Sequence, residues 1–172
     1  SRNNCNAIVK TDQNKLVFGC TTTIIPNTVE CIGYGAFSHC SNLTSITLPN
    51  SITKLEPHSF SYCNRLKSIN LPNGVDTIDY MAFMSCDSLE EVVMTNHLKY
   101  LGSSAFQKCH HLTNVLLSDS ITTIPYSLFK ECTSLSSIVI PSNVTTIGQR
   151  AFELCNNLQS ISILSSINII DK

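Results

Sequence analysis

Apolar side chains recur along this chain at a fixed spacing of 23 residues. In each unit a phenylalanine is followed by a cysteine, a leucine and two alternating apolar positions, as in Phe37, Cys40, Leu43, Ile46 and Leu48. The phenylalanine returns in the same register, without a slip of one residue, at Phe60, Phe83, Phe106, Phe129 and Phe152. A fixed period of about 20–50 residues is typical of a solenoid, whose units bury their apolar faces by stacking on one another.

Each unit changes its periodicity halfway, and this change predicts the local structure. The pattern Phe-x-x-Cys-x-x-Leu has the spacing of one face of a 3₁₀ or tight α turn. The alternation that follows indicates a short strand. Proline ends that strand in several units, at Pro26, Pro49, Pro72 and Pro141. The residue before the phenylalanine is usually alanine, which fits a crowded inner turn, and Ser59 and Leu128 are the variants.

These patterns predict one domain over residues 1–172. Residues 1–25 contain two short apolar runs separated by Lys10–Lys15, which predict a hairpin that caps the first repeat. Residues 26–163 hold six 23-residue repeats, and residues 164–172 begin a further repeat without completing it. An incomplete repeat exposes core positions, so we expect the C-terminal edge to fray or to associate weakly end to end.

The unit formed by residues 43–65, LTSITLPNSITKLEPHSFSYCNR, resembles the Treponema-type, BspA-like leucine-rich repeats. The likeness covers residues 26–163 and continues weakly to Ile170. It implies an α/β solenoid, a right-handed curved superhelix with a parallel β-sheet on its concave face and short 3₁₀ or α turns on its convex face. It also implies an extracellular or cell-surface protein, often an adhesin, that binds other proteins without being an enzyme.

The nine cysteines raise the question of metal, disulfide or catalytic chemistry. Close pairs such as C-x₂-C are absent from the sequence, so no zinc site is predicted. Six of the cysteines share the register of the core, which favours buried packing: Cys40, Cys63, Cys86, Cys109, Cys132 and Cys155. Cys5 and Cys20 flank the irregular N-terminal segment, and a disulfide between them stays an open alternative. An odd total excludes full pairing within the chain.

Charge and motifs narrow the function further. The chain has 11 basic and 12 acidic residues and no basic block, which argues against nucleic acid as a partner. No apolar run approaches the roughly 20 residues that span a bilayer, so no membrane insertion is expected. The start, Ser-Arg-Asn-Asn-Cys, is not a signal peptide. Motifs for catalysis, phosphate or dinucleotide binding are absent, so we predict no catalytic residues and no cofactor.

The residues between the inward-facing positions of each strand should lie on the concave surface, where a partner would bind. Most are small and polar, but an apolar strip is expected on the three middle strands at Val93, Leu116 and Val139, beside Glu91, Asn114 and Ser137. Such a strip on a rigid sheet is a candidate protein-binding patch, and ordinary β-propensity is the alternative explanation. The sequence therefore favours a protein-recognition module, with a host matrix or cell-surface protein as the kind of partner. The alternative is a structural spacer without its own ligand.

Overall fold

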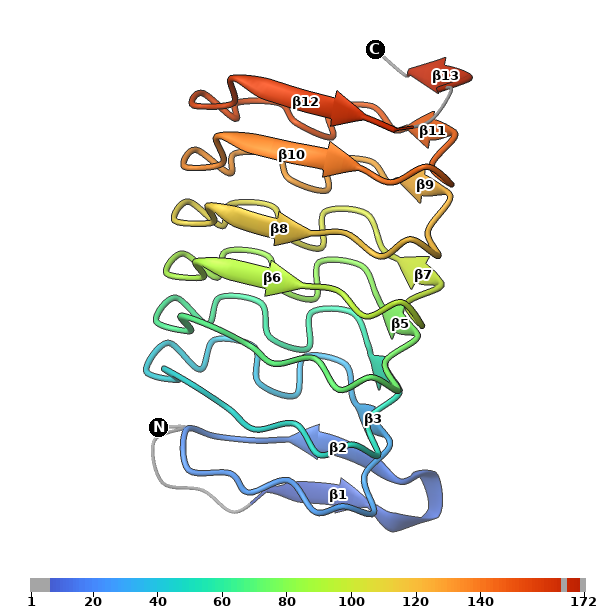
Figure 1. Cartoon of the computed structure of the whole chain (residues 1–172). Coiled ribbons are helices and arrows are strands. Elements are labelled where there is room, and N and C mark those ends of the chain that lie inside the picture. The colour runs from blue at the N-terminus through green and yellow to red at the C-terminus, as the bar shows by residue number, and fades with distance from the viewer. Residues whose placement is uncertain (1–6, 165–166, 171–172) are drawn as a thin grey trace.

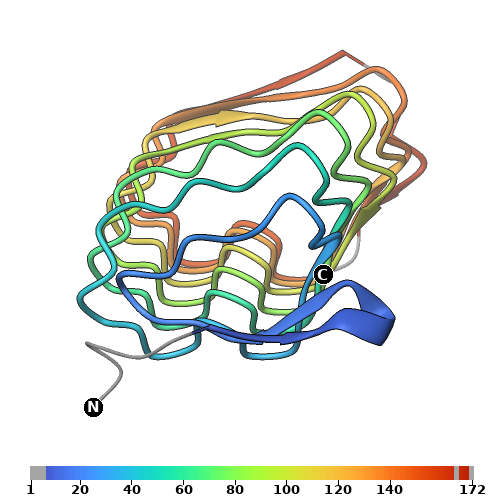
Figure 2. The ribbon, with the colours of Figure 1, turned by 90° about the horizontal axis from the view of Figure 1, so that it is seen from below.

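The computed structural model describes residues 7–164 and 167–170 and shows a β-solenoid of about six coils stacked along one axis (Figure 1). The first coil rests against an antiparallel hairpin made of β1 (Ile8–Lys10) and β2 (Lys15–Phe18), with the 3₁₀ turn η1 (Thr11–Gln13) between them. Viewed along the axis in Figure 2, the coils have extended segments on two sides and a zigzag of turns on a third.

Two kinds of strand build these coils, and the sequence predicted only one of them. The predicted strands form the long-strand face, which comprises β6 (Glu91–Val93), β8 (Asn114–Leu116), β10 (Ser137–Ile140) and β12 (Ser160–Ile163). A second set of two-residue strands follows the long segments and forms the short-strand side, namely β3 (Cys31–Ile32), β4 (Lys54–Leu55), β5 (Thr77–Ile78), β7 (Tyr100–Leu101), β9 (Thr123–Ile124), β11 (Thr146–Ile147) and β13 (Ile169–Ile170). Neighbouring strands within each set run parallel wherever they pair.

The expectation that every repeat forms a long strand was wrong for the first two. Residues 45–47 and 68–70 contain no named strand, and the backbone bonds here are few. The Lys67 amide donates to the Thr44 carbonyl at 3.3 Å, and Ser68 forms an isolated bridge with Glu91. In these coils, hydrogen bonds between coils are therefore formed only where the long segment begins, and the rest of the segment is not paired as a strand.

Within residues 7–164 and 167–170 the convex face contains none of the predicted 3₁₀ or α helical turns, so the α/β assignment is corrected to a β-solenoid. Among the residues described, η1 is the only helical element. Two positions in each repeat, two residues before and two after the phenylalanine, have φ between 51° and 63°. These left-handed residues break any right-handed helical turn. The side of the coils that they form is called the turn side below.

The left-handed residues direct alternate amides of the turn side toward the next coil. The Phe37 amide, for example, donates to the Ser59 carbonyl one coil later at 2.8 Å, and the Cys40 amide donates within its own coil to the Phe37 carbonyl at 2.9 Å. A helix would satisfy all of these donors within one coil. The turn side instead forms a second set of hydrogen bonds between coils, in addition to the sheets.

The core is a set of side-chain columns that run along the axis. The phenylalanine rings stack from Phe37 to Phe106 with centroid separations of 5.0–5.4 Å and interplanar angles of 2–3°. The repeat cysteines lie beside them, and their thiols do more than fill space. The Cys86 thiol donates to the Phe60 carbonyl of the preceding coil at 3.2 Å, and Cys63, Cys109, Cys132 and Cys155 repeat this bond. Each of these thiols is thus a buried link between coils.

One junction between coils differs from all the others, and we call it the seam. It lies between the coil that carries β7 and β8 and the coil that carries β9 and β10. Within residues 7–164 and 167–170, no backbone hydrogen bond joins β7 to β9 or β8 to β10, so both sheets are interrupted here. Figure 1 shows these two coils set further apart than their neighbours. The turn side remains bonded across the seam, as by the Ser104 amide to the Tyr126 carbonyl at 2.9 Å.

Candidate functional site

The predicted strip lies on the long-strand face, with all three of its apolar side chains about half exposed. The exposed fractions are 48% for Val93, 58% for Leu116 and 51% for Val139. Val93 and Leu116 are direct partners in the β6–β8 ladder, and parallel pairing places their side chains on the same face. The strip is not continuous, because Leu116 and Val139 lie on opposite sides of the seam.

The polar neighbours of the strip divide in the same way. Glu91 and Asn114 are paired in β6 and β8, and the Asn114 amide donates to the Glu91 carboxylate at 2.6 Å. Ser137 lies across the seam and pairs instead with Ser160 in the last long strand. The six predicted residues therefore form two groups of neighbours, four before the seam and two after it.

Two grooves border the strip. The first, of about 520 Å³, lies between residues 68–73 and β6, and Glu91, Val93 and Leu116 contribute to its walls. The second, of about 400 Å³, follows the seam between Leu116 and Val139, and its lining is mostly apolar. Leu116 stands between the two grooves, so it is the centre of the candidate site.

Three asparagines that the predicted site did not include line the first groove, namely Asn70, Asn73 and Asn96; the sequence had placed Asn70 on the concave face, but it gave no role to the other two. They lie at the end of one long segment and in the loops that follow two of them, where the repeat pattern carries no apolar residue. An asparagine side chain offers both donors and an acceptor, so this groove can hydrogen-bond a partner's backbone. Their clustering depends on the stacking of adjacent coils. The available signal was the recurrence of asparagine after the strand in successive repeats.

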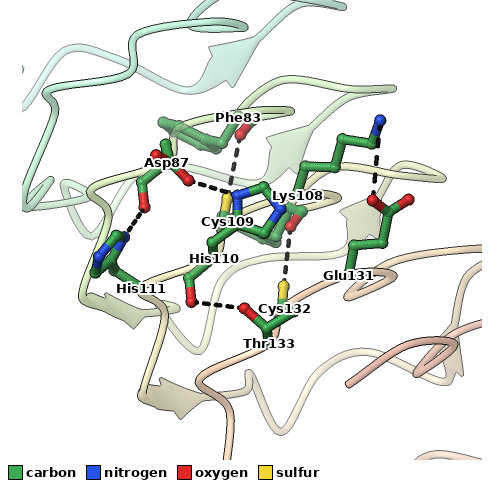
Figure 3. A network of polar contacts seen from close by, with 10 residues as sticks. Phe83, Asp87, Lys108, Cys109, His110, His111, Glu131, Cys132 and Thr133 are labelled. Carbon is green, nitrogen blue, oxygen red and sulfur yellow. Dashed lines mark hydrogen bonds and ion pairs between the residues drawn. The ribbon is translucent and has the colours of Figure 1, made fainter. Parts of the chain in front are cut away.

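The triplet Cys109-His110-His111 with Asp87 has the residue types of a cysteine–histidine–aspartate site, and Figure 3 shows their arrangement. The His110 Nδ1 lies 2.5 Å from the Asp87 carboxylate, and the His111 Nδ1 lies 2.8 Å from the Asp87 carbonyl oxygen. The Cys109 thiol is fully buried and donates to the Phe83 carbonyl at 3.3 Å. Burial raises the pKa of Cys109 to about 12, which disfavours the thiolate that a nucleophile requires. The histidines therefore cross-link two turns of the solenoid.

The described part of the chain contains neither a cluster of metal ligands nor a helix that could span a membrane. Across residues 7–164 and 167–170, no group of three or more histidine, cysteine or acidic side chains is placed to hold a metal ion. In the same residues, no helix has the length and apolar character to cross a bilayer. Cys5, which the sequence left as a candidate partner of Cys20, lies outside the described residues.

The stacked coils, the parallel strands and the repeated phenylalanine and cysteine columns define a β-solenoid repeat protein of the leucine-rich type. The family described as "BspA type Leucine rich repeat region" matches this chain in six copies, over residues 17–135 and 54–172. The chain belongs to this BspA-type leucine-rich repeat family. No curated protein shows significant similarity to the chain.

Several solved structures are similar to it. A leucine-rich repeat protein from Bacteroides ovatus ATCC 8483 has 27% identity and a TM-score of 0.65, over 84% of this chain and 43% of that one. A leucine rich cell surface protein from Faecalibacterium prausnitzii A2-165 has 25% identity and a TM-score of 0.53, over 81% of this chain and 58% of that one. The leucine rich repeat protein of T. pallidum has 25% identity and a TM-score of 0.61, over 89% of this chain and 87% of that one. This chain thus spans about half the length of the first two.

Proposed function

We propose that this chain is a non-enzymatic protein-recognition module that binds its partner through the long-strand face. The observation that carries the proposal is the strip itself. Three large apolar side chains lie about half exposed on one face, and a groove borders each of them. Adjacent exposed apolar side chains such as Val93 and Leu116 can mark a binding site, and the backbone beneath them is held by the stacked coils.

The arrangement resembles the centre of a protein interface. An apolar anchor, Leu116, is flanked by polar groups that can hydrogen-bond, including the Glu91–Asn114 pair and the asparagines of the first groove. Interfaces commonly combine an apolar centre with a polar rim. The grooves on either side of Leu116 would receive side chains of the partner.

The place of action that we propose is outside the cell or on its surface. The support is the family, together with the similar protein of F. prausnitzii, which is described as a cell surface protein. A host matrix or cell-surface protein is the partner class that this location favours.

The test is a capture experiment with two matched variants. The first carries Val93→Ser, Leu116→Ser and Val139→Ser. The control carries Tyr34→Ser, Tyr100→Ser and Tyr126→Ser, which removes three exposed aromatic side chains (69%, 52% and 41%) that lie away from the long-strand face. Immobilised wild type, variant and control are exposed to solubilised extracellular matrix and epithelial surface proteins, and bound proteins are identified by mass spectrometry.

Recognition through the strip predicts a protein that wild type and control retain and the strip variant loses. Equal binding by all three proteins would reject the long-strand face as the binding site. A wild type that retains nothing above the background of the bare support would favour the alternative, in which this solenoid is a spacer that projects another domain.

A further inference from the structure

The seam divides the proposed binding face, and its cause lies in two residues that do not line the groove between Leu116 and Val139. We infer that Pro125 and Leu128 set the width of this groove, and are thereby specificity-determining positions of the face. The inference rests on the proposed function for its biological meaning, but the structural effect of the two residues can be tested without a partner.

Pro125 removes a hydrogen bond that the other coils make. The same slot of the repeat is held by Gly33, Glu56, Asp79, Gly102 and Gly148, and each of these amides donates to the preceding coil at 2.7–2.9 Å. Proline has no amide hydrogen to donate. The carbonyl of Leu101, one coil before Pro125, therefore lacks the bond that its equivalents receive. β7 and β9 separate at this position, and a groove of about 350 Å³ opens between them.

Leu128 places a large side chain where the other coils have a small one. Its slot precedes the repeat phenylalanine and is otherwise filled by Ala36, Ser59, Ala82, Ala105 and Ala151. Leu128 is completely buried, so its extra volume is accommodated inside the stack. Protein interiors are close-packed, and an added side chain must displace its neighbours.

The distances at the seam agree with this displacement. The Phe106 amide lies 3.1 Å from the Leu128 carbonyl, whereas the equivalent bonds of Phe37, Phe60 and Phe83 are 2.8 Å. The rings of Phe106 and Phe129 are 5.9 Å apart and inclined by 15°, compared with 2–3° in the preceding pairs. The regular stacking thus ends at the seam, and the following pair, Phe129 and Phe152, keeps a similar geometry at 5.8 Å and 18°. The turn side thus stays joined while the coils diverge on the strand sides.

The divergence changes the binding face, because β8 and β10 do not pair. Their backbone groups, which in the β6–β8 and β10–β12 ladders bond to a neighbouring strand, border the 400 Å³ groove. A partner side chain that enters between Leu116 and Val139 would meet an apolar lining with unpaired backbone donors and acceptors beside it. A continuous ladder would close this entry.

The variants Pro125→Gly and Leu128→Ala restore the residue types of the other repeats, singly and together. The measurement is amide hydrogen exchange by NMR, combined with nuclear Overhauser contacts between β8 and β10. In wild type we expect the amides of Thr122 and Ser136 to exchange at least tenfold faster than those of Thr145 and Gln159. The latter are the equivalents one coil later, and both are hydrogen-bonded.

In the double variant we expect the exchange of Thr122 and Ser136 to slow to the level of their equivalents, and backbone contacts to appear between the two strands. Equal protection of the two pairs in wild type would overturn the inference, and so would a folded double variant with unchanged exchange. If Leu128→Ala fails to fold, Pro125→Gly alone still tests the inference, because it restores an amide that can donate to the Leu101 carbonyl and should slow the exchange of Thr122; unchanged Thr122 exchange in that folded variant would overturn the role of Pro125. Because none of these measurements involves a partner, failure to find a ligand would reject the proposed function and leave the seam intact.

Discussion

The cysteine column offers a direct test of what holds adjacent coils together. Cys86 is fully buried, and its thiol donates to the Phe60 carbonyl at 3.2 Å, an oxygen that also accepts the Cys63 amide at 3.2 Å. Cys86→Ala removes both the sulfur and the donor. Cys86→Ser removes the sulfur but keeps a hydroxyl that can donate to the same oxygen. The two variants therefore separate packing from hydrogen bonding.

The expected magnitudes follow from these two contributions. A neutral hydrogen bond contributes about 1 kcal/mol, and the buried sulfur contributes about as much as one methylene, roughly 1 kcal/mol. We expect Cys86→Ala to lower the free energy of unfolding by about 2 kcal/mol and Cys86→Ser by about 1 kcal/mol. If the thiol were only apolar filler, the unpaired serine hydroxyl would cost about 1–3 kcal/mol more, and serine would be the less stable variant.

Urea unfolding followed by far-ultraviolet circular dichroism, with reductant present, measures this order. With a denaturant slope of about 1–3 kcal/mol per molar, a difference of about 1 kcal/mol moves the midpoint by roughly 0.3–1 M. The matched control is the pair Val75→Ala and Val75→Ser at a fully buried apolar position, where no side-chain hydrogen bond is replaced and serine should be the less stable variant. A serine variant at position 86 that unfolds before the alanine variant would refute the hydrogen-bonding role.

Three further outcomes are expected. Burial raises the pKa of Cys109 from 9.0 to about 12, so at this residue only the unfolded state ionises between these values, and the contribution of Cys109 to stability should fall by about 1.4 kcal/mol between pH 8 and pH 10. Urea midpoints across this range should show a shallower fall for Cys109→Ala. Burial alone would raise the pKa of Glu56, but hydrogen bonds from Lys15, at 2.7 Å, and from the Tyr34 amide outweigh it and hold this pKa below 4.5. The resulting stabilisation should be present above pH 4.5, be lost as the pH falls through the lowered pKa, and be absent in Glu56→Gln; an identical acid transition in that variant would contradict the assignment. At the C-terminal edge, Ile163 and Ile170 are 45% and 65% exposed, so sedimentation velocity should show concentration-dependent association that Ile163→Lys with Ile170→Lys abolishes. A single monomeric species at all concentrations would count against it.

The candidate site was predictable only in part. Alternation along a strand predicts which side chains are exposed, but it does not predict which residues of different coils lie next to one another. Alternation along β6 and β8 was enough to place Val93 and Leu116 on the same face. It could not indicate that Val139 lies across an interrupted ladder, since hydrogen bonding between coils depends on how closely they approach. Pro125 and Leu128, the residues that we infer open the seam, are visible in the sequence as departures from the repeat pattern. Their effect depends on the positions that they occupy in the stack of coils.

The sequence by itself determined the solenoid, its period and its core columns. A spacing of 23 residues brings identical side chains into register, and burial of apolar surface then favours stacking over any other arrangement. The tertiary structure decided the form of the turn side, the second set of strands and the position of the seam. The residue types of His58 and Met81 do not predict a positive φ. They adopt it because their own amides bond to carbonyls of the adjacent coil. Such bonds are made between units far apart along the chain, so a pattern within one unit cannot specify them.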